Sequence, residues 1–261
     1  MPKVNVNGIM LYYESVGEGY PLVLTHGFSA THEMWKAQEP LAKQYRLITY
    51  DARGHGDSDS PPSSDEYSAD ISVEDLFQLM KVLELKKTVI GGLSMGGYIS
   101  LRFYLKHPEL VSALIIMDTG PGYRNPTRMA EWNQSREELA KQLETEGVSV
   151  LATQATTQGR REINLKQNPI GLAHMSRKVV AQYDSLVIEN LDKIKVPALI
   201  LVGENDTPFL QAAQYMEKNI ASAQLIVVPN AGHSANIDNT EFFNDAILSF
   251  LSKDEIKTQI L

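Results

Sequence analysis

Alternation of apolar and polar residues near the N-terminus predicts a β-hairpin. Val4 and Val6 alternate with polar residues, and the same alternation resumes from Ile9. Asn7-Gly8 lies between the two runs, and this dipeptide readily adopts the positive φ angles of a tight two-residue turn. We therefore expect the chain to begin with two antiparallel strands.

The next strand pattern is apolar without interruption. Residues 21–25 read Pro-Leu-Val-Leu-Thr, and a continuous apolar run of this length is typical of a strand covered on both faces. Strand-like and helix-like segments then alternate as βαβ units do. The predicted strands cover residues 46–50, 88–91 and 113–117, and the predicted helices cover 32–43, 73–85 and 95–107. This alternation predicts an α/β fold with a mostly parallel sheet and helices on both faces.

The alternation stops after residue 118. Residues 119–126 are rich in Gly and Pro, and the following stretch is mostly helical to about residue 190. Its expected helices are 128–146, 148–156 and 171–186. The α/β pattern returns with strands at 197–202 and 224–228 and helices at 209–220 and 240–251. We therefore expect a core built from residues 1–120 and 191–261, interrupted by a helical insertion over residues 121–190.

Composition excludes several classes of function. The 261 residues carry 24 Lys and Arg against 32 Asp and Glu, and the nearest approach to a basic run is Arg160-Arg161, so nucleic acid is not an expected partner. Cys is absent and the six His show no metal-ligand spacing, so we expect no disulfide, thiolate catalysis or metal centre. The sequence shows no signal, lipidation or membrane-spanning pattern, which predicts a cytoplasmic protein with no membrane partner.

The string Gly92-Leu-Ser94-Met-Gly96 lies where an apolar strand ends and a helical pattern starts. In that context the small flanking residues predict a sharp turn that holds Ser94 in a strained conformation above the strand ends. The N-terminus of the following helix favours a negative charge that develops there. The alternative, a Ser at an ordinary helix N-cap, does not account for the surrounding glycines, which include Gly91 and Gly97. Ser94 is therefore the candidate nucleophile.

A Ser hydroxyl needs a base whose pKa lies near the working pH, and His is the natural candidate. His233 lies in a small-residue loop after a predicted strand and before the last helix, so it can project over the same sheet edge as Ser94. The other histidines have weaker contexts: His26 and His55 in loops that they would brace, His107 at the far end of the Ser94 helix, and His32 and His174 without a turn context. His233 is the candidate base.

A carboxylate is needed to fix the tautomer of His233 and to stabilise its cation. Asp206 follows the penultimate predicted strand and gives the chain order Ser94, Asp206, His233, which is the order expected for this arrangement of strands. Asp118, at the end of the strand after the Ser94 helix, is the competing acid, and Glu204 is a more remote alternative. We favour Asp206.

Two backbone N–H groups would complete the site by binding the negative oxygen of the reacting carbonyl group. One belongs to Met95, the residue after the nucleophile. The other must come from the loop after the first parallel strand, where His26-Gly27-Phe28 follows directly, and we expect the Phe28 N–H to be the donor. Gly27 allows the backbone to turn inward, and His26 is expected to hydrogen-bond neighbouring loops.

Five motifs that span nearly the whole chain together resemble the α/β-hydrolase superfamily. They are His26-Gly27-Phe28, Asp51-Ala-Arg-Gly-His-Gly-Asp-Ser58, Gly92-Leu-Ser-Met-Gly-Gly97, Gly203-Glu-Asn-Asp206 and Ala231-Gly-His233. The resemblance implies an eight-stranded, mostly parallel sheet, a helical cap inserted after the sixth strand, and no cofactor. The insertion at 121–190 falls where that cap belongs, and residues 51–58 would be a segment that braces loops.

Within that superfamily, the string Gly-Leu-Ser-Met-Gly-Gly looks like carboxylesterases, enol-lactonases and cofactor-free perhydrolases. The resemblance thus implies cleavage of ester or lactone bonds in small apolar molecules through an acyl-enzyme. Carbon–carbon bond hydrolases of vinylogous diketones are an alternative, since their elbow also reads Ser-Met-Gly-Gly. They usually carry Asn where this chain has Leu93, and they need a cap Arg for an acidic substrate. The candidates are Arg124, Arg128, Arg160, Arg161 and Arg177.

Apolar side chains should line the pocket for a small ester, and we expect Phe28, Trp35, Trp132 and Met175 to do so. Trp35 is the first choice, because it follows the Phe28 loop closely and would lie near the mouth. A rival of another class is a catalytically silent scaffold, against which the presence of all three catalytic residue types argues. The expected assembly is a monomer or homodimer.

Overall fold

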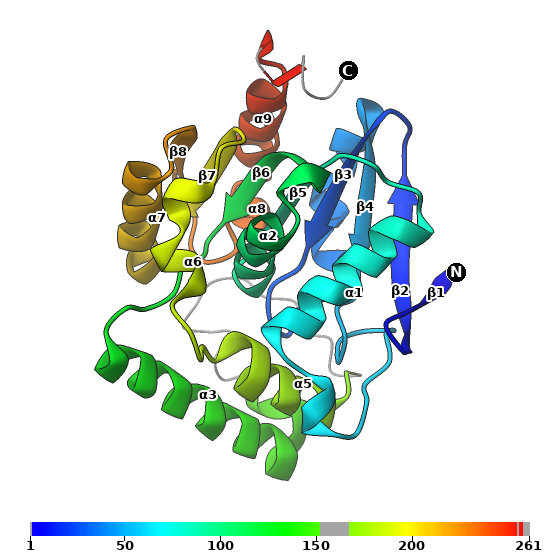
Figure 1. Cartoon of the computed structure of the whole chain (residues 1–261), viewed down its shortest axis with the longest axis vertical. Helices are drawn as coiled ribbons and strands as arrows, with labels where there is room; N and C mark the ends of the chain where they lie inside the picture. The colour runs from blue at the N-terminus through cyan, green and yellow to red at the C-terminus, as the bar shows by residue number, and fades with distance from the viewer. Residues whose placement is uncertain (1, 152–166, 255, 258–261) are drawn as a thin grey trace.

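The computed structural model describes residues 2–151, 167–254 and 256–257. Eight strands form one sheet in the order β1-β2-β4-β3-β5-β6-β7-β8 (Figure 1). They are β1 Lys3–Val6, β2 Ile9–Val16, β3 Tyr20–Thr25, β4 Tyr45–Tyr50, β5 Thr88–Leu93, β6 Val111–Met117, β7 Ala198–Gly203 and β8 Ala223–Val228. Strand β2 is antiparallel to β1 and β4, and all other neighbours are parallel. The predicted α/β fold and mostly parallel sheet are confirmed.

Helices and single turns connect these strands. The α-helices are α1 Ala69–Val82, α2 Met95–Lys106, α3 Pro126–Glu146, α5 Pro169–Met175, α6 Leu186–Glu189, α7 Thr207–Asn219, α8 Ala235–Asp238 and α9 Thr240–Leu251. The 3₁₀ segments are η1 His32–Lys43, η2 Ser64–Glu66, η3 Pro108–Leu110, η4 Gly147–Ser149 and η6 Leu191–Lys193, and η5 Ser176–Val180 is a π-helical turn.

The central strands β3 to β7 bury both of their faces, which divides the core into two layers. On one face, Leu22 and Leu24 of β3 belong to the cluster that contains residues of η1, α8 and α9. On the other face, Val23 belongs to the cluster that contains residues of α1, α2 and α7. Adjacent residues of a strand point to opposite faces, so the continuous apolar run of β3 supplies both layers.

The N-terminal hairpin forms as the sequence predicts. Val6 pairs with Ile9, and the two residues between them have positive φ angles of 48° at Asn7 and 80° at Gly8. These angles belong to the tight turn that the Asn-Gly dipeptide favours. The hairpin forms the antiparallel edge of the sheet beside β4 (Figure 1).

Two predicted helices differ from the observed ones. The helix predicted over 73–85 begins at Ala69, because the Ser68 hydroxyl caps it by accepting the Ile71 N–H at 3.0 Å. The helix predicted over 171–186 breaks into α5, η5 and α6, with extended backbone at Ala181. Next to that break, two hydrogen bonds join the Asn133 side chain to the backbone of Gln182. Asn133 Oδ1 accepts the Gln182 N–H at 2.7 Å, and Asn133 Nδ2 donates to the Gln182 carbonyl at 2.6 Å.

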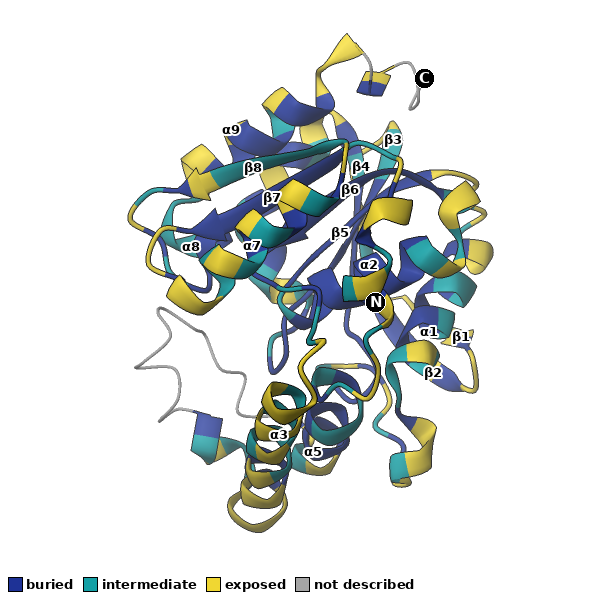
Figure 2. Ribbon diagram, turned by 60° about the vertical axis from the view of Figure 1, so that its left-hand side comes forward, coloured by how far each residue is buried: buried dark blue, intermediate teal, exposed yellow. Residues whose placement is uncertain are grey.

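Whereas α6 contacts α2, helices α3 and α5 pack together beyond one end of the sheet (Figures 1 and 2). Leu139, Leu143 and Leu172 are buried between these helices and join the core cluster of the sheet. Most of the outward side of α3 is exposed (Figure 2). The division at residues 121 and 190 stays a prediction, and most of the helix expected over 148–156, together with Arg160 and Arg161, lies outside the described residues.

Candidate active site

Ser94 forms a sharp turn between β5 and α2. Its φ of 55° and ψ of −114° lie in a region that residues with a side chain rarely adopt. The Ser94 hydroxyl makes no capping hydrogen bond to α2, so the alternative of an ordinary helix N-cap is wrong. The strained turn predicted from the sequence is present, and it leaves the hydroxyl directed to another partner.

Close packing requires the glycines on both sides of this turn. A Cβ at Gly96 would collide with the carbonyl oxygen of Thr25 at the end of β3. A Cβ at Gly97 would lie 2.6 Å from the Thr119 methyl group, and one at Gly91 would lie 2.7 Å from the carbonyl oxygen of Ile115. A larger residue at Gly96 or Gly97 would therefore push the start of α2 away from the sheet, and Ser94 would move with it.

His233 and Asp206 meet Ser94 at this edge of the sheet. His233 Nε2 lies 3.0 Å from Ser94 Oγ, and His233 Nδ1 lies 2.7 Å from Asp206 Oδ2. The carboxylate accepts the Nδ1 proton, which leaves Nε2 as the acceptor of the Ser94 O–H, a tautomer assigned from these partners. The His233 side chain is 10% exposed, and the Phe209 ring stacks on it at 4.8 Å. The structure thus brings together the three residues that the sequence selects.

The competing acids have other partners. Asp118 Oδ1 accepts the Gly203 N–H at 2.8 Å, and its Oδ2 accepts the Ala235 N–H at 3.2 Å. Burial raises the pKa of Asp118 well above its usual range, the Asp206 charge adds to this, and the two backbone hydrogen bonds oppose it. Glu204 accepts the Asn230 N–H at 3.0 Å. Asp206 is the acid whose carboxylate contacts the imidazole of His233.

The loop after β3 lies against the nucleophile. A Cβ at Gly27 would be 3.7 Å from Ser94 Cβ, which is an ordinary van der Waals distance and places this loop in contact with the Ser94 turn. The next residues form a turn closed by a hydrogen bond from the Ala30 N–H to the Gly27 carbonyl at 3.1 Å. Phe28 occupies that turn and is 6% exposed, while Met95 is the first residue of α2. The N–H of a first helical residue has no acceptor within its own helix, and the role of both amides stays a prediction.

Two buried histidines brace the loops behind the site, in the structural role that the sequence predicts. His26 Nδ1 lies 2.7 Å from the Gly27 carbonyl, and its Nε2 accepts the Ala52 N–H at 2.9 Å. His55 Nδ1 lies 3.1 Å from the Arg53 carbonyl, and its Nε2 accepts the Ser29 N–H at 3.2 Å. Both rings are neutral in this arrangement because a protonated Nε2 could not accept a hydrogen bond. Burial lowers the pKa of both rings, in His55 to about 3.

A second His–Asp pair has no counterpart in the sequence interpretation. His32 Nδ1 lies 2.8 Å from Asp51 Oδ1, and the same oxygen accepts the His32 N–H at 2.7 Å. Asp51 Oδ2 accepts the Asp57 N–H at 2.8 Å, which ties η1 to the predicted bracing segment 51–58. The sequence offered only the position of His32 at the start of the helix predicted over 32–43, and no spacing linked it to Asp51.

The residues expected at a substrate pocket have different environments. Trp35 is 1% exposed and belongs to the core cluster between the sheet and η1 and α9, so the expectation that it lies near the mouth is wrong. The chain turns back over the sheet after the Phe28 loop and carries Trp35 inward. Met175 of α5 is fully buried and packs against Gly54: a Cβ added at Gly54 would lie only 3.1 Å from Met175 Cγ. Trp132 is half-buried on α3, and its indole N–H donates to the Val180 carbonyl at 2.8 Å.

The candidate arginines of the insertion are mostly engaged or exposed. Arg177 pairs with Glu144 and Glu137, whose hydrogen bonds and charges outweigh the effect of desolvation and raise the pKa of Arg177. Arg124 donates to the Ile188 carbonyl, and Arg128 is exposed.

Arg136, which the sequence interpretation did not select, is half-buried on α3, with its guanidinium 4.5 Å from the centre of the Trp132 ring. Burial lowers the pKa of Arg136, and among the described residues it forms no ion pair with a carboxylate. Trp132, Arg136 and Leu139 are spaced four and three residues apart, which places them on one face of a helix. This spacing was the signal that could have identified Arg136 as a partly buried residue of the insertion.

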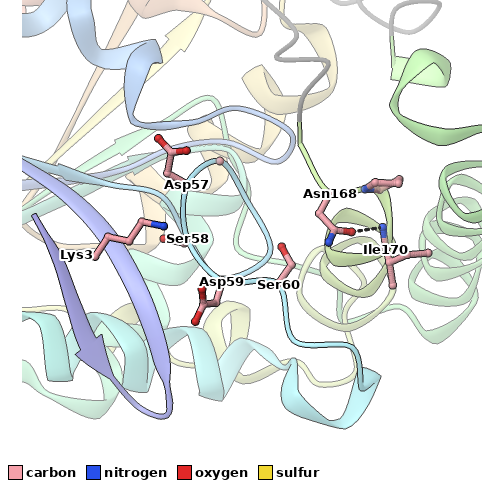
Figure 3. A pocket seen from close by; sticks show the side chains of 9 residues that line it. Lys3, Asp57, Ser58, Asp59, Ser60, Asn168 and Ile170 are labelled. Carbon is pink, nitrogen blue, oxygen red and sulfur yellow. Dashed lines mark hydrogen bonds between the residues drawn. The ribbon is translucent and has the colours of Figure 1, made fainter. Parts of the chain in front are cut away.

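A hollow of about 600 Å³ lies between the loop after β4 and the start of α5 (Figure 3). Its lining contains neither Ser94 nor Asp206 nor His233, so it is a separate surface feature. The charged groups on it come from Lys3, Asp57 and Asp59, with Asn168 and Ile170 on the opposite side (Figure 3).

Within the part of the chain that the structure describes, no three His, Asp or Glu side chains gather in a way that could hold a metal ion. In the same residues, no helix has the length and apolar character that crossing a membrane requires.

With this geometry, the chain belongs to the family described as "alpha/beta hydrolase fold", whose sequence model matches residues 20–190. It is 28% identical to a putative 2-succinyl-6-hydroxy-2,4-cyclohexadiene-1-carboxylate synthase of Bacillus subtilis, over 88% of this chain and 90% of the relative. It is 29% identical to a 2-hydroxy-6-oxo-6-(2'-aminophenyl)hexa-2,4-dienoic acid hydrolase of Metapseudomonas resinovorans, over 96% of this chain and 90% of the relative. A solved thermophilic esterase from Thermogutta terrifontis matches all of both chains with a TM-score of 0.88 at 28% identity. The resemblance to α/β hydrolases is confirmed.

Proposed function

We propose that this hydrolase cleaves carboxylic ester or lactone bonds of small apolar substrates, with Ser94, His233 and Asp206 as its catalytic residues. The observation that carries the proposal is the continuous hydrogen-bonded series from Ser94 Oγ to His233 at 3.0 Å and from His233 to Asp206 at 2.7 Å. A nucleophile, its base and an orienting acid in this geometry are what acyl transfer needs. The similarity to a solved esterase over the full chain supports the same reaction class.

The reaction takes place in two steps. Ser94 Oγ attacks the carbonyl carbon while His233 Nε2 takes its proton, and the carbonyl oxygen becomes an anion facing the amides of Phe28 and Met95. The tetrahedral intermediate expels the alcohol, which receives the proton from His233, and an acyl-enzyme remains on Ser94. Water then loses a proton to His233 and attacks the acyl carbon, and Ser94 leaves with that proton as the acid is released. These steps require no cofactor.

Fluorophosphonate labelling tests this proposal, because the probe modifies a Ser only when it is activated as a nucleophile. We expect one label on the wild-type chain, none on Ser94→Ala, and loss of p-nitrophenyl acetate hydrolysis in that variant with an unchanged melting temperature. Labelling of Ser58→Ala should be retained, since Ser58 is a buried Ser that donates to the Asp51 carbonyl. An unlabelled wild-type chain would favour the silent scaffold, and hydrolysis retained by Ser94→Ala would assign the activity elsewhere.

A second candidate function is hydrolysis of a carbon–carbon bond in a vinylogous diketone that carries a carboxylate. Arg136 favours it, because a half-buried cation of the insertion that forms no ion pair with a described carboxylate could bind an anionic substrate group. The relative from Metapseudomonas resinovorans is named for a hydrolase of a dienoic acid. Comparison of kcat/KM for p-nitrophenyl esters with that for a 2-hydroxy-6-oxo-dienoic acid separates the two, and Arg136→Met should reduce only the latter.

A further inference from the structure

Ser29, the residue after Phe28, has both backbone polar groups held by side chains from other segments. Its N–H donates to His55 Nε2 at 3.2 Å, and its carbonyl accepts a hydrogen bond from Gln167 Nε2 at 2.7 Å. Ser29 is 4% exposed and has a φ of 61°, which a residue with a side chain rarely adopts. The turn that carries Phe28 therefore depends on partners outside the turn.

His55 is the fixed partner of that turn. Its Nδ1 faces the Arg53 carbonyl, so its Nε2 is available to accept the Ser29 N–H. The His55 ring also packs edge-to-face on the Phe28 ring, with 5.8 Å between centres and an angle of 90°. This histidine belongs to the core, so its contacts with the turn do not involve the insertion.

Gln167 is the partner from the insertion. It is 4% exposed and lies 138 residues from Ser29 in the chain. Its Oε1 accepts the Gly56 N–H at 3.2 Å, which fixes the orientation of the amide and points Nε2 at the Ser29 carbonyl. The side chain thus connects the insertion with the loop after β4 and with the Phe28 turn.

We propose that Gln167 is a positioning residue for the reaction: by holding the Ser29 carbonyl, it sets the direction of the Phe28 N–H toward the carbonyl oxygen of a substrate on Ser94. The insertion thereby takes part in stabilising the transition state as well as in enclosing the substrate. A backbone donor is effective only when it is held in place for the position that the anionic oxygen will occupy. This inference rests on the proposed function.

Thionoesters provide the test, because sulfur in place of the carbonyl oxygen accepts hydrogen bonds weakly and gains little from oriented amides. We compare p-nitrophenyl acetate with p-nitrophenyl thionoacetate in wild type, Gln167→Leu and Gln167→Glu. Leu removes both hydrogen bonds at similar volume, whereas an ionised Glu still accepts the Gly56 N–H but cannot donate to Ser29. We expect kcat on the oxygen ester to fall roughly 10- to 100-fold in both variants with little change in KM, and kcat on the thionoester to fall much less.

Asp184→Asn is the matched control. Asp184 forms another link between the insertion and the core, to Arg102 of α2 at 2.8 Å, and does not contact the Phe28 turn. Its variant should retain the ratio of oxygen-ester to thionoester rates. Equal losses on both substrates in the Gln167 variants, or failure of both variants to fold, would overturn the positioning role, because Gln167 would then serve stability alone. A wild-type chain without fluorophosphonate labelling would instead overturn the proposed function.

Discussion

Two His–Asp pairs with nearly equal geometry occur at different places in the molecule. His233 Nδ1 lies 2.7 Å from Asp206, and His32 Nδ1 lies 2.8 Å from Asp51. They differ in what faces the second ring nitrogen. His233 Nε2 faces the Ser94 hydroxyl at 3.0 Å, whereas His32 Nε2 lies 3.5 Å from a carboxylate oxygen of Glu14.

This difference separates a candidate base from a structural histidine. Burial opposes the charged form of His32, but the hydrogen bond and charge of Asp51, with the charge of Glu14, outweigh it and raise the pKa of His32. The group that faces His32 Nε2 is a carboxylate, which is an acceptor and no nucleophile with a proton to lose, so this ring has no reacting hydroxyl beside it. A His–Asp pair is therefore no sufficient sign of a catalytic site, and the partner of Nε2 decides the chemistry.

The largest expected effect comes from replacing each histidine with Asn, whose amide can still donate to the neighbouring carboxylate. His233→Asn removes the Nε2 acceptor, so kcat/KM for p-nitrophenyl acetate should fall roughly 10⁴- to 10⁶-fold. His32→Asn should retain kcat/KM within a few-fold and lower the free energy of unfolding, measured in urea. Comparable losses of activity in the two variants would contradict the distinction between the two pairs.

The next effect concerns the two acids. Asp206→Asn should reduce kcat by roughly 10⁴-fold at unchanged stability, because an amide in place of the carboxylate disfavours the tautomer with Nδ1–H. Asp51→Asn should instead lower stability by about 1–3 kcal/mol, since its amide group would face either His32 donors or the Asp57 N–H. Steady-state kinetics and urea unfolding of both variants measure the contrast.

Asp118→Asn tests the competing acid and should have a smaller effect on activity. One of its two oxygens would become an NH₂ group facing the N–H of Gly203 or Ala235, which should cost about 1–3 kcal/mol of stability. We expect kcat to fall less than roughly 10-fold, because Asp118 acts on the backbone around the site. If Asp118→Asn loses activity and Asp206→Asn keeps it, the acid has been assigned wrongly.

The smallest expected effect is on the pH dependence of stability. His55 and His32 contribute slopes of stability against pH that have opposite signs. The pKa of His55 falls from 6.5 to about 3 on folding, so the unfolded chain binds more protons between these values and stability decreases as pH falls through this window. The slope from this one group is at most about 1.4 kcal/mol per pH unit. The pKa of His32 is raised, so its stabilisation is complete below 6.5 and is lost as pH rises through its folded pKa.

Urea unfolding between pH 4 and pH 9 measures both slopes. His55→Gln should reduce the acid slope while leaving the alkaline side unchanged, and His32→Asn should do the opposite. His26 contributes with the same sign as His55, because burial lowers its pKa as well. An acid slope unchanged in His55→Gln would show that this ring is not the neutral brace that its hydrogen bonds indicate.

The core could be predicted from sequence in more detail than the insertion. Helix α9 spans Thr240–Leu251, as the spacing of its apolar residues predicts. That spacing is regular because one face of the helix is buried against the sheet. The helix expected over 171–186 breaks at Ala181, next to the segment that Asn133, 49 residues away from Gln182, holds by hydrogen bonds. Trp35 was misplaced for a related reason, since nearness to Phe28 in the chain said nothing about the direction in which η1 turns.

The elements, the turn at Ser94 and the candidates Asp206 and His233 could be predicted from the sequence alone, because they depend on local rules: apolar periodicity, glycine clearance and the ends of strands. Which groups lie within hydrogen-bond distance depends on how the whole chain folds, since His233 lies 27 residues from Asp206 and 139 from Ser94. The same holds for His32 with Asp51 and for Gln167 with Ser29. These partners come together because distant segments pack against one another. Such packing produces no periodic pattern in the sequence from which the pairs could be predicted.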